Sequence, residues 1–563
     1  MKKMFSSMLF PLAEKNIEGL TKETLDSLIE IPQDSSRGDF ALPCFQFAKV
    51  MRKAPQMIAS ELAGAFSADF IERTEAVSGY LNFFVNRSVF AARAFEEIKA
   101  AAVWGADTFK GKKALIEHTS INPNASPHLG RARNAFIGDS VARLLRFLGF
   151  DTEVHYFVND IGKQISMLVY ALKDREDITF DMLLSEYVKV NDELKEHPEI
   201  ETIVFDQLAK LEGGDKEMTV QFRRIVDICM EGQKALFSEI GIKYDFFDYE
   251  SQYIVSGRTD EVIEKLRQTG RLSEDENGRE VLDLGDYGFE QKILPVTRAD
   301  KTSLYPLRDI CYSLDKASRG KDVNLIILGE DQTMYGKQIN AALDVLGEKG
   351  AEIINYSFVL LSTGKMSTRQ GKVVMLSDVM EQVAERAAQQ LEERNGTRDI
   401  EKAKSIGYGA MKYAMLKCGY GKNVLFDWDM VLNMQGDSSL YLQYNYARIM
   451  SLCKKYAVQF PGSSYDTPDT SMLTSNSDWE LLKTVYGFRE LLAQMPENGY
   501  PVANIANYLY SLAQQYSKWY FDNPILTNDN KAVTDARMWL SVSAAQVIKS
   551  GLGILGIDVV ESM

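Results

Sequence analysis

The chain has 563 residues, several times the roughly 100–200 of a typical domain, so several domains are expected. Its composition, 45% hydrophobic and 25% charged, is that of a globular protein and excludes a disordered, collagen-like or disulfide-scaffold chain. With 64 Lys and Arg against 79 Asp and Glu, the net charge is −15, which excludes a globally basic nucleic-acid binder but not a local basic groove.

Cysteine usage and hydropathy predict a cytoplasmic protein. The five cysteines are far apart and form no CxxC pair, so disulfides are not expected. The four histidines form no cluster with cysteine, and we therefore predict no metal site. The first apolar run is broken by Pro11 and followed by charged residues, unlike a secretory signal, and no stretch approaches the roughly 18 apolar residues of a membrane span.

Residues 1–105 are predicted to form an α+β domain. The alternating run at 76–86 predicts a strand, on which Asn82 and Asn86 share a face with Phe84. Spacing alone favours a half-buried sheet whose polar face meets solvent.

A parallel-sheet domain is predicted to begin at 106–164. The segment 113–118 predicts a strand, a Pro/Asn-rich turn follows, and a helix then runs to Gly149, a residue type that commonly ends helices. The segment 152–158 predicts the next strand. This strand–helix–strand order indicates a βαβ unit and hence a parallel sheet.

The rest of the chain is predicted to split that sheet and to end in helices. Residues 165–285 are charged and mostly helical, for example at 181–195 and 206–237, and are taken as an insertion. The sheet resumes in 286–400 with strands at 304–308, 323–328 and 358–361, and residues 401–563 form amphipathic helices around a polar loop at 461–478. The expected fold is therefore α/β and multidomain: a Rossmann-like parallel-sheet domain split by an insertion, an α+β N-terminal domain and an all-α C-terminal bundle.

The start of the helix after the first predicted strand is suited to a nucleotide. A helix N-terminus offers unpaired N–H groups and the positive end of the helix dipole to phosphate. Gly130 lacks a side chain and permits close approach, while His128 can donate to phosphate oxygens as charge develops on them. By itself this short pattern would often arise by chance.

A second phosphate signal lies about 235 residues later. The glycine-bounded segment 362–372 carries Lys365, Arg369 and Lys372, and such a loop can close cations over a triphosphate. The alternative is a solvated basic loop, which charge runs usually are. The two signals in this order make a stronger joint case.

Together the two segments resemble class I aminoacyl-tRNA synthetases. His128-Leu129-Gly130-Arg131 resembles their HIGH signature, and Lys365-Met366-Ser367-Thr368 resembles their KMSKS loop. The segments 116–123, 303–309, 329–332 and 441–448, with the terminal Met563, narrow the resemblance to the arginyl-tRNA synthetases over the whole chain. It implies that L-arginine is activated with MgATP to arginyl-adenylate and transferred to the 3′ end of tRNA(Arg), by a usually monomeric enzyme with no tightly bound cofactor.

The resemblance also implies the ligands of arginine. A guanidinium is a planar, permanent cation that requires carboxylates and in-plane acceptors. Glu117, Tyr305 and Asp309 would surround the guanidinium and α-amino end, and Asn122 and Gln332 would hold the main-chain groups. Other interpretations stay open, since Glu117 could cap a helix and Asp309 could pair with a surface arginine.

The remaining implied residues bind ATP and tRNA. The ATP ligands would be His128, Gly130, Arg131, Lys365, Met366 and Ser367, and the catalytic groups His128, Arg131, Lys365 and Arg369. The N-terminal domain would contact tRNA through Asn82, Phe84 and Asn86, and the C-terminal, anticodon-binding domain through Asp437, Tyr441, Tyr444, Arg448 and Met563. A buried Tyr/Leu helix stripe is the strong alternative for the C-terminal set.

The chain departs from both signatures. Arg131 stands where the second histidine is usual, Thr368 replaces the second lysine of the loop, and Ala125 occupies the position of a compensating lysine. We hypothesise that Arg131 and Arg369 supply the missing charge. Two alternatives are a catalytically weakened paralogue that binds tRNA and a cysteinyl enzyme, the latter disfavoured because no zinc-ligand cluster is present.

Overall fold

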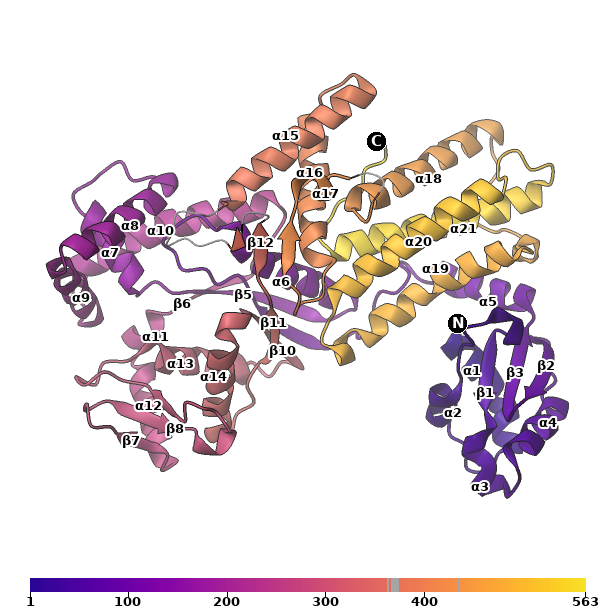
Figure 1. The fold of residues 1–563 in the computed structure, drawn as a ribbon, viewed down its shortest axis with the longest axis horizontal. Coiled ribbons are helices and arrows are strands. Elements are labelled where there is room, and N and C mark those ends of the chain that lie inside the picture. Colours follow the sequence, from indigo (N-terminus) through magenta and orange to yellow (C-terminus); the bar gives the residue numbers. More distant parts are fainter. Residues whose placement is uncertain (362–363, 366–373, 434–435, 563) are drawn as a thin grey trace. The chain divides into compact units, whose positions relative to one another are not determined.

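The computed structural model describes residues 1–361, 364–365, 374–433 and 436–562 (Figure 1). It divides into two compact units. The first comprises residues 1–106, 448–492 and 511–548, and the second comprises residues 107–447, 493–510 and 549–563. Within the described ranges, none of the helices is both long and apolar enough to cross a membrane.

A parallel sheet forms the centre of the second unit. Among the described residues it has five strands in the order β11-β10-β4-β5-β6. The chain runs outward from β4 through β5 to β6 and then returns to β10 on the other side of β4, so the strand order reverses between β4 and β10, where open α/β sheets bind ligands at the carboxyl ends of their strands. The strands are β4 (Lys113–Glu117), β5 (Asp151–Val158), β6 (Phe246–Tyr249), β10 (Val323–Gly329) and β11 (Glu352–Tyr356).

Helix α6 (Leu129–Phe147) covers β4, β5 and β10 and confirms the predicted βαβ unit. Gly149 follows the helix with a φ of +93°, a left-handed conformation that favours glycine. Asn134 fixes the helix to the sheet, because its Oδ1 accepts from Thr119 N at 2.6 Å and its Nδ2 donates to Ile327 O at 2.8 Å.

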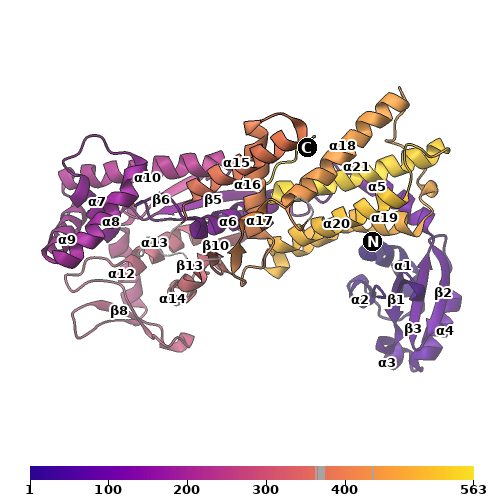
Figure 2. The same ribbon diagram turned by 45° about the horizontal axis from the view of Figure 1, so that its top comes forward.

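The segment 165–285 is not wholly separate from the sheet, because β6 lies within it and pairs with β5. Its helices α7, α8, α9 and α10 group together (Figures 1 and 2). The predicted helix at 206–237 is two helices, since Gly213, Gly214 and the capping Asp215 end one and begin the next. The bounds are α7 (Lys163–Leu172), α8 (Phe180–Glu196), α9 (Glu199–Glu212) and α10 (Lys216–Glu239).

Two segments predicted as strands of the central sheet do not belong to it. The segment 304–308 begins helix α13 (Tyr305–Ser318): Pro306 occupies its first turn, where proline suits a helix start, and its apolar residues pack at helical spacing. The segment 358–361 contains β12, which pairs with β13 and β14 in a separate small sheet. The central sheet uses β11 instead. These strands are β12 (Val359–Leu361), β13 (Gly364–Lys365) and β14 (Val424–Phe426), the last within the range predicted to be all-helical.

A second small sheet packs with helices that lie on both sides of β10 in the sequence. Strands β7, β8 and β9 are antiparallel and, with helices α12, α13 and α14, enclose an apolar core around Leu282, Leu284 and Leu307. The elements are α11 (Gln252–Val255), α12 (Arg258–Gln268), β7 (Leu272–Glu274), β8 (Glu280–Asp283), β9 (Ile293–Pro295) and α14 (Thr333–Val345).

The first unit contains a small antiparallel sheet and helices from both ends of the chain. The predicted strand at 76–86 is a hairpin, because Ser78 and Gly79 adopt φ of +52° and +83° and turn the chain from β2 into β3. On this sheet, Phe5 stacks on Phe40 of β1 and meets Phe83 of β3 edge to face in the core. The elements are α1 (Lys2–Asn16), α2 (Lys22–Leu28), β1 (Phe40–Pro43), α3 (Ala48–Met51), α4 (Pro55–Ala65), β2 (Ile71–Val77), β3 (Tyr80–Val85) and α5 (Arg87–Ala100).

The helices after β13 are α15 (Leu376–Asn395), α16 (Ile400–Leu416), α17 (Trp428–Val431), α18 (Ser439–Gln459), α19 (Asn476–Gln494), α20 (Val502–Asp522) and α21 (Lys531–Ile554). The helices α18 to α21 have residues in both units. The predicted polar loop at 461–478 lies between α18 and α19, and Asn476 already begins the second of these helices.

Candidate active site

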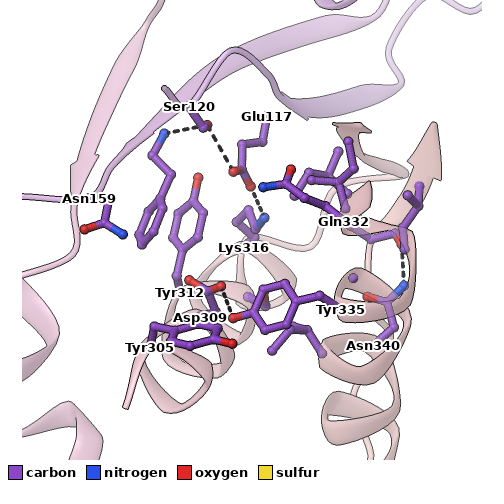
Figure 3. A pocket seen from close by; sticks show the side chains of 18 of the residues that line it. Glu117, Ser120, Asn159, Tyr305, Asp309, Tyr312, Lys316, Gln332, Tyr335 and Asn340 are labelled. Carbon is purple, nitrogen blue, oxygen red and sulfur yellow. Dashed lines mark hydrogen bonds and ion pairs between the residues drawn. The ribbon is translucent and has the colours of Figure 1, made fainter. Parts of the chain in front are cut away.

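A cavity of about 410 Å³ lies at the carboxyl ends of β4 and β10, where the strand order reverses (Figure 3). All five residues predicted to bind arginine line it, although their roles stay a prediction. Those residues are Glu117, Asn122, Tyr305, Asp309 and Gln332.

Helix α13 supplies one wall of this cavity. Tyr305, Asp309, Tyr312 and Lys316 are spaced by four, three and four residues, which places them on one face of a helix. The correction of the segment from strand to helix therefore matters for the site: in a strand, residues four apart lie about 13 Å from each other.

One end of the cavity carries Asp309 with aromatic side chains around it. The Tyr335 hydroxyl donates a hydrogen bond to the Asp309 carboxylate, and the rings of Tyr305 and Tyr335 lie 5.3 Å apart (Figure 3). Loss of solvent and the charge of Glu117 raise the pKa of Asp309 to about 6, although Tyr335 favours its ionised form. A cationic ligand placed here would remove that penalty.

The opposite end carries Glu117, whose carboxylate forms a buried ion pair with the Lys316 ammonium. Ser120 Oγ also donates to Glu117, at 3.2 Å. The chain leaves the sheet after His118, whose N still donates to His155 O of β5 at 3.2 Å; Thr119 and Ser120 then adopt φ of +71° and +41°, which is unfavourable for residues with a side chain and typical of functional sites. Glu117 therefore caps no helix, and its partner is an internal lysine.

Glu250, a residue that sequence reasoning missed, is a third carboxylate of the same cavity. It is fully buried and pairs with Arg308 through Oε1, while its Oε2 has no hydrogen-bond partner within the described residues. Burial raises the pKa of Glu250 to about 7 despite that pairing. An unpartnered buried oxygen in a cavity suggests a donor on the ligand. Glu250 directly follows strand β6, and a carboxylate at the end of a sheet strand would have pointed to the site; the sequence, however, does not predict this strand.

A second cavity, of about 690 Å³, adjoins the first and shares Ser120, Asn122 and Gln332 with it. It is lined by the turn before α6, including His128 and Arg131, and by one face of α8. The two predicted ligand sites, for an amino acid and for a nucleotide, are thus contiguous.

His128 is the N-cap of α6 and an uncharged donor toward this cavity. Its Nδ1 accepts from Arg131 N at 3.3 Å, so the proton of the neutral ring lies on Nε2. Burial and the nearby Arg131 charge lower the pKa of His128 to about 4, which keeps the ring neutral near pH 7. Gly130 is the second residue of the helix and half-buried.

Arg131 lines the second cavity from the first turn of α6, and its guanidinium forms no ion pair with any carboxylate in the described parts of the chain. Lys365 ends β13, opposite Leu360 of β12. Met366, Ser367 and Arg369 lie outside the described residues. The chain after them is tied to the turn, since Leu129 N donates to Val374 O at 3.0 Å and Leu376 N to Pro127 O at 2.9 Å.

The candidates for tRNA contact in the N-terminal domain differ in accessibility. Asn82 is buried in β3, so the predicted solvated face is wrong at this position; β3 is the central strand, between β1 and β2. Phe84 is half-buried, with the Arg73 guanidinium 3.5 Å from its ring centre. Asn86 is half-buried and donates from Nδ2 to Asp69 O at 3.1 Å.

The C-terminal candidates lie in or just before α18. Tyr444 is 43% exposed, whereas Leu442 and Ile449 are fully buried, so the buried-stripe alternative holds for the aliphatic residues and not for Tyr444. Asp437 accepts from Tyr413 Oη at 2.7 Å. Tyr441 packs against Tyr510, Arg448 lies 4.2 Å from the Tyr520 ring centre, and Met563 lies outside the described residues.

Three protein families match successive parts of the chain. Residues 2–85 match the arginyl tRNA synthetase N terminal domain, residues 98–428 the catalytic domain of class I tRNA synthetases (R), and residues 442–563 the DALR anticodon binding domain. The catalytic match covers most of the second unit, including both cavities.

Relatives of full length are also similar. An arginine–tRNA ligase of Methanocaldococcus jannaschii is 34% identical over 98% of both chains, and one of Clostridium perfringens is 32% identical over 97% of both. Among solved structures, the arginyl-tRNA synthetase of Thermus thermophilus matches with a TM-score of 0.81 over the whole of both chains at 23% identity. A methionyl-tRNA synthetase of Mycobacterium tuberculosis matches with a TM-score of 0.52 at 13% identity, over 78% of this chain and 90% of that one. These structural likenesses show the fold alone.

Proposed function

The chain belongs to the arginyl-tRNA synthetase family and is an arginine–tRNA ligase, and on this premise we propose which residues carry its two reaction steps. The observation that carries the proposal is the cavity at the sheet's switch point, which gathers three carboxylates beside a nucleotide-type turn. A cation and a triphosphate are the two charged groups that the first step must bring together.

The 410 Å³ cavity would bind arginine with its guanidinium toward Asp309 and Glu250. Both carboxyls have pKa values raised by burial, and Asp309 is flanked by Tyr305 and Tyr335, whose rings suit a planar cation. Glu117, already paired with Lys316, would accept the α-amino group. Asn122 and Gln332 border both cavities and would orient the α-carboxylate toward ATP.

Activation would occur where the cavities meet. An oxygen of the arginine carboxylate attacks the α-phosphorus of ATP, supplied as its Mg²⁺ complex, and the bond to pyrophosphate breaks. His128 would donate from Nε2 to a phosphate oxygen, and Arg131 would contribute positive charge as the leaving group departs. Gly130, Lys365, Met366, Ser367 and Arg369 are proposed to complete the ATP site.

The second step joins the amino acid to tRNA(Arg). A terminal ribose hydroxyl attacks the arginyl carbonyl carbon, and AMP leaves. We propose that Phe84 and Asn86 contact the tRNA from the N-terminal domain, with the buried Asn82 supporting their strand, and that Asp437, Tyr441, Tyr444, Arg448 and Met563 contact the anticodon. Tyr444 has the most accessible ring of the aromatic candidates on α18, as stacking on a base requires.

The test is charging of purified tRNA with radiolabelled arginine, and in parallel cysteine, in the presence of MgATP. We expect charged tRNA with arginine and none with cysteine. Product with cysteine would contradict the assignment of the cavity, and product with neither amino acid would favour a tRNA-binding paralogue.

Tyr444→Ala should weaken tRNA binding about fivefold, the low end of the stacking range, whereas Phe521→Ala, a change at an exposed aromatic of α20, should not.

We further propose that the enzyme acts as a cytoplasmic monomer. Light scattering of the purified protein should give one chain's mass of 63.5 kDa. A mass of twice that value would contradict this part of the proposal.

A further inference from the structure

The turn between β4 and α6 rests on a pair of buried side chains that the reaction scheme does not use. They are Gln233 of α10 and Tyr156 of β5, which are 0% and 1% exposed. Both lie beneath residues 121–125, the part of the turn that separates Glu117 from His128.

Gln233 contacts the turn through its amide. Its Nε2 donates to Ala125 O at 2.9 Å and lies 3.4 Å from Asn122 O. Cys229, one helical turn earlier on α10, adds a weak contact from its Sγ to Ala125 O at 3.7 Å. The carbonyl groups of Asn122 and Ala125 thus contact α10, and Asn122 O also accepts from Asn124 N at 2.8 Å.

Tyr156 links the other end of the turn to the same glutamine. Its hydroxyl donates to Gln233 Oε1 at 2.6 Å, accepts from Ile121 N at 3.1 Å, and lies 3.0 Å from Ile121 O. Tyr156 thus holds the amide of Gln233, and Gln233 in turn holds the carbonyl of Ala125. One connected hydrogen-bond network therefore fixes the backbone at both Ile121 and Ala125.

This network bears on the site because the turn carries ligands of both substrates. Asn122 lines both cavities, with its Nδ2 donating to Gln164 Oε1 at 3.0 Å, and Ala125 lines the second cavity three residues before His128. A displacement of about 1 Å in such a group can reduce a rate by about a hundredfold. If the amide of Gln233 were lost, Ala125 O would keep only the weak contact from Cys229 Sγ and Asn122 O would keep Asn124 N as its donor, so the turn would be held less tightly at Ala125.

We propose that Gln233, supported by Tyr156, is a positioning residue that sets Asn122 for the amino acid. The proposal rests on the assignment of the first cavity to arginine. Helix α10, which lies within the predicted insertion 165–285, would thereby help to position the amino acid. Gln233 touches neither substrate, and its effect passes through the backbone of the turn.

The experiment is a double-mutant cycle on the full-length enzyme, with the KM for arginine and kcat measured in tRNA charging. Gln233→Met keeps the length of the side chain and removes the amide. We expect it to raise the KM for arginine at least threefold, and we expect the double variant with Asn122→Ala to show nearly the same KM as Asn122→Ala alone. Residues that act through one another are not additive.

Gln207→Met is the matched control. Gln207 is a buried glutamine on α9 that accepts from Ser166 Oγ at 2.9 Å, so its loss tests the general effect of removing a buried amide from these helices. We expect its KM for arginine to stay within threefold of wild type and its effect to multiply with that of Asn122→Ala. Thermal unfolding and tRNA binding show whether each variant is folded.

A rise of less than threefold in Gln233→Met, or an effect that multiplies with that of Asn122→Ala, overturns the proposal. If Gln233→Met does not fold, Tyr156→Phe carries the same test, because it removes a single buried oxygen and is held to the same threshold. Wild-type enzyme is measured alongside: if it charges tRNA with arginine while the variants are unaffected, only the positioning role fails. If wild type does not use arginine, the assignment of the cavity fails instead.

Discussion

The two adjoining cavities of the second unit handle charge in opposite ways. The 410 Å³ cavity is lined by carboxylates, and each of Glu117, Glu250 and Asp309 has a partner inside the protein. The 690 Å³ cavity has, in His128 and Arg131, a neutral imidazole and a guanidinium without a carboxylate partner among the described residues, beside a helix N-terminus. A cation site must stabilise its own buried charges, whereas an anion site can use backbone N–H groups and neutral donors.

This difference has a consequence for selectivity. Carboxylates withdrawn from water gain most from a ligand that brings a permanent positive charge, and a neutral analogue such as citrulline leaves them uncompensated. The 690 Å³ cavity, where His128 is neutral, carries no comparable cost of burying carboxylates. We therefore expect substitutions in the first cavity to change the amino-acid parameters strongly and those in the second to change the chemical step.

The largest effect is expected from Asp309→Asn. Removing this charge takes away one of the two carboxylates proposed to face the guanidinium, and truncation of one member of such a charge pair costs about 2–5 kcal/mol, so kcat/KM for arginine should fall by about 10³-fold. The KM for ATP should change little. Asp315→Asn, a change on the same helix at an exposed carboxylate paired with Arg258, is the matched control. An equal loss in both variants would contradict the assigned role.

Arg131→Ala should reduce the rate of aminoacylation by about 10²-fold or more, the scale of one transition-state donor, with little change in the KM for arginine. Arg146→Ala removes an arginine from the last turn of the same helix, where it pairs with Asp245, and should be nearly silent. An effect below about threefold in Arg131→Ala would show that this arginine does not replace the missing charge of the signatures.

Low pH should weaken the binding of arginine more than that of ATP. The KM for arginine should rise about tenfold for each pH unit below 6. The pKa of Asp309 is raised to about 6, and bound guanidinium stabilises the ionised form, so arginine must displace a proton at lower pH and its KM rises. Glu250, with its pKa near 7, adds to the same trend. His128 has a pKa of about 4 and stays neutral over this range, so it gives the KM for ATP no such step. A KM for arginine that is constant from pH 5 to 8 would contradict the carboxylate site.

The smallest effect is expected from Tyr305→Leu, at the rim of the first cavity. The ring is 54% exposed, and a cation over an exposed ring gains about 0.5–1 kcal/mol, so the KM for arginine should rise about two- to fivefold. Phe205→Leu, at a similarly exposed aromatic of α9, provides the comparison. A loss as large as that of Asp309→Asn would mean that the aromatic rim and not the carboxylate dominates recognition.

Local sequence predicted the helix start beside the second cavity, whereas only tertiary packing decided the charge partners within the first. The order of strand, turn and helix at 113–149 placed His128 at a helix start, and the structure confirms it as the N-cap. That prediction needed only neighbouring residues. The first cavity joins β4, β10, α13 and α14, and its internal partners Lys316 and Tyr335 were missed because each meets its carboxylate through tertiary packing.

Two failures of prediction show where local pattern is insufficient. The four residues of β6 lie between charged helices and have no alternation long enough to indicate a strand, so the sequence predicts an insertion over 165–285 and gives no signal for Glu250. The apolar run at 304–308 is compatible with either a strand or a buried helix. It begins helix α13, and the face that this helix turns toward the cavity decides which side chains line it.

By itself the sequence determined the βαβ start of the catalytic domain, the polar turn at its helix and the motifs that identify the family, because these depend on residues close together along the chain. Only the tertiary structure decided which partner each acidic side chain of the first cavity meets, how Gln233 contacts the turn, and which of the candidate RNA contacts are exposed. Pairing of buried charges and amides depends on distance in space, and segments as far apart as Glu117 and Lys316 acquire that distance only when the chain has folded.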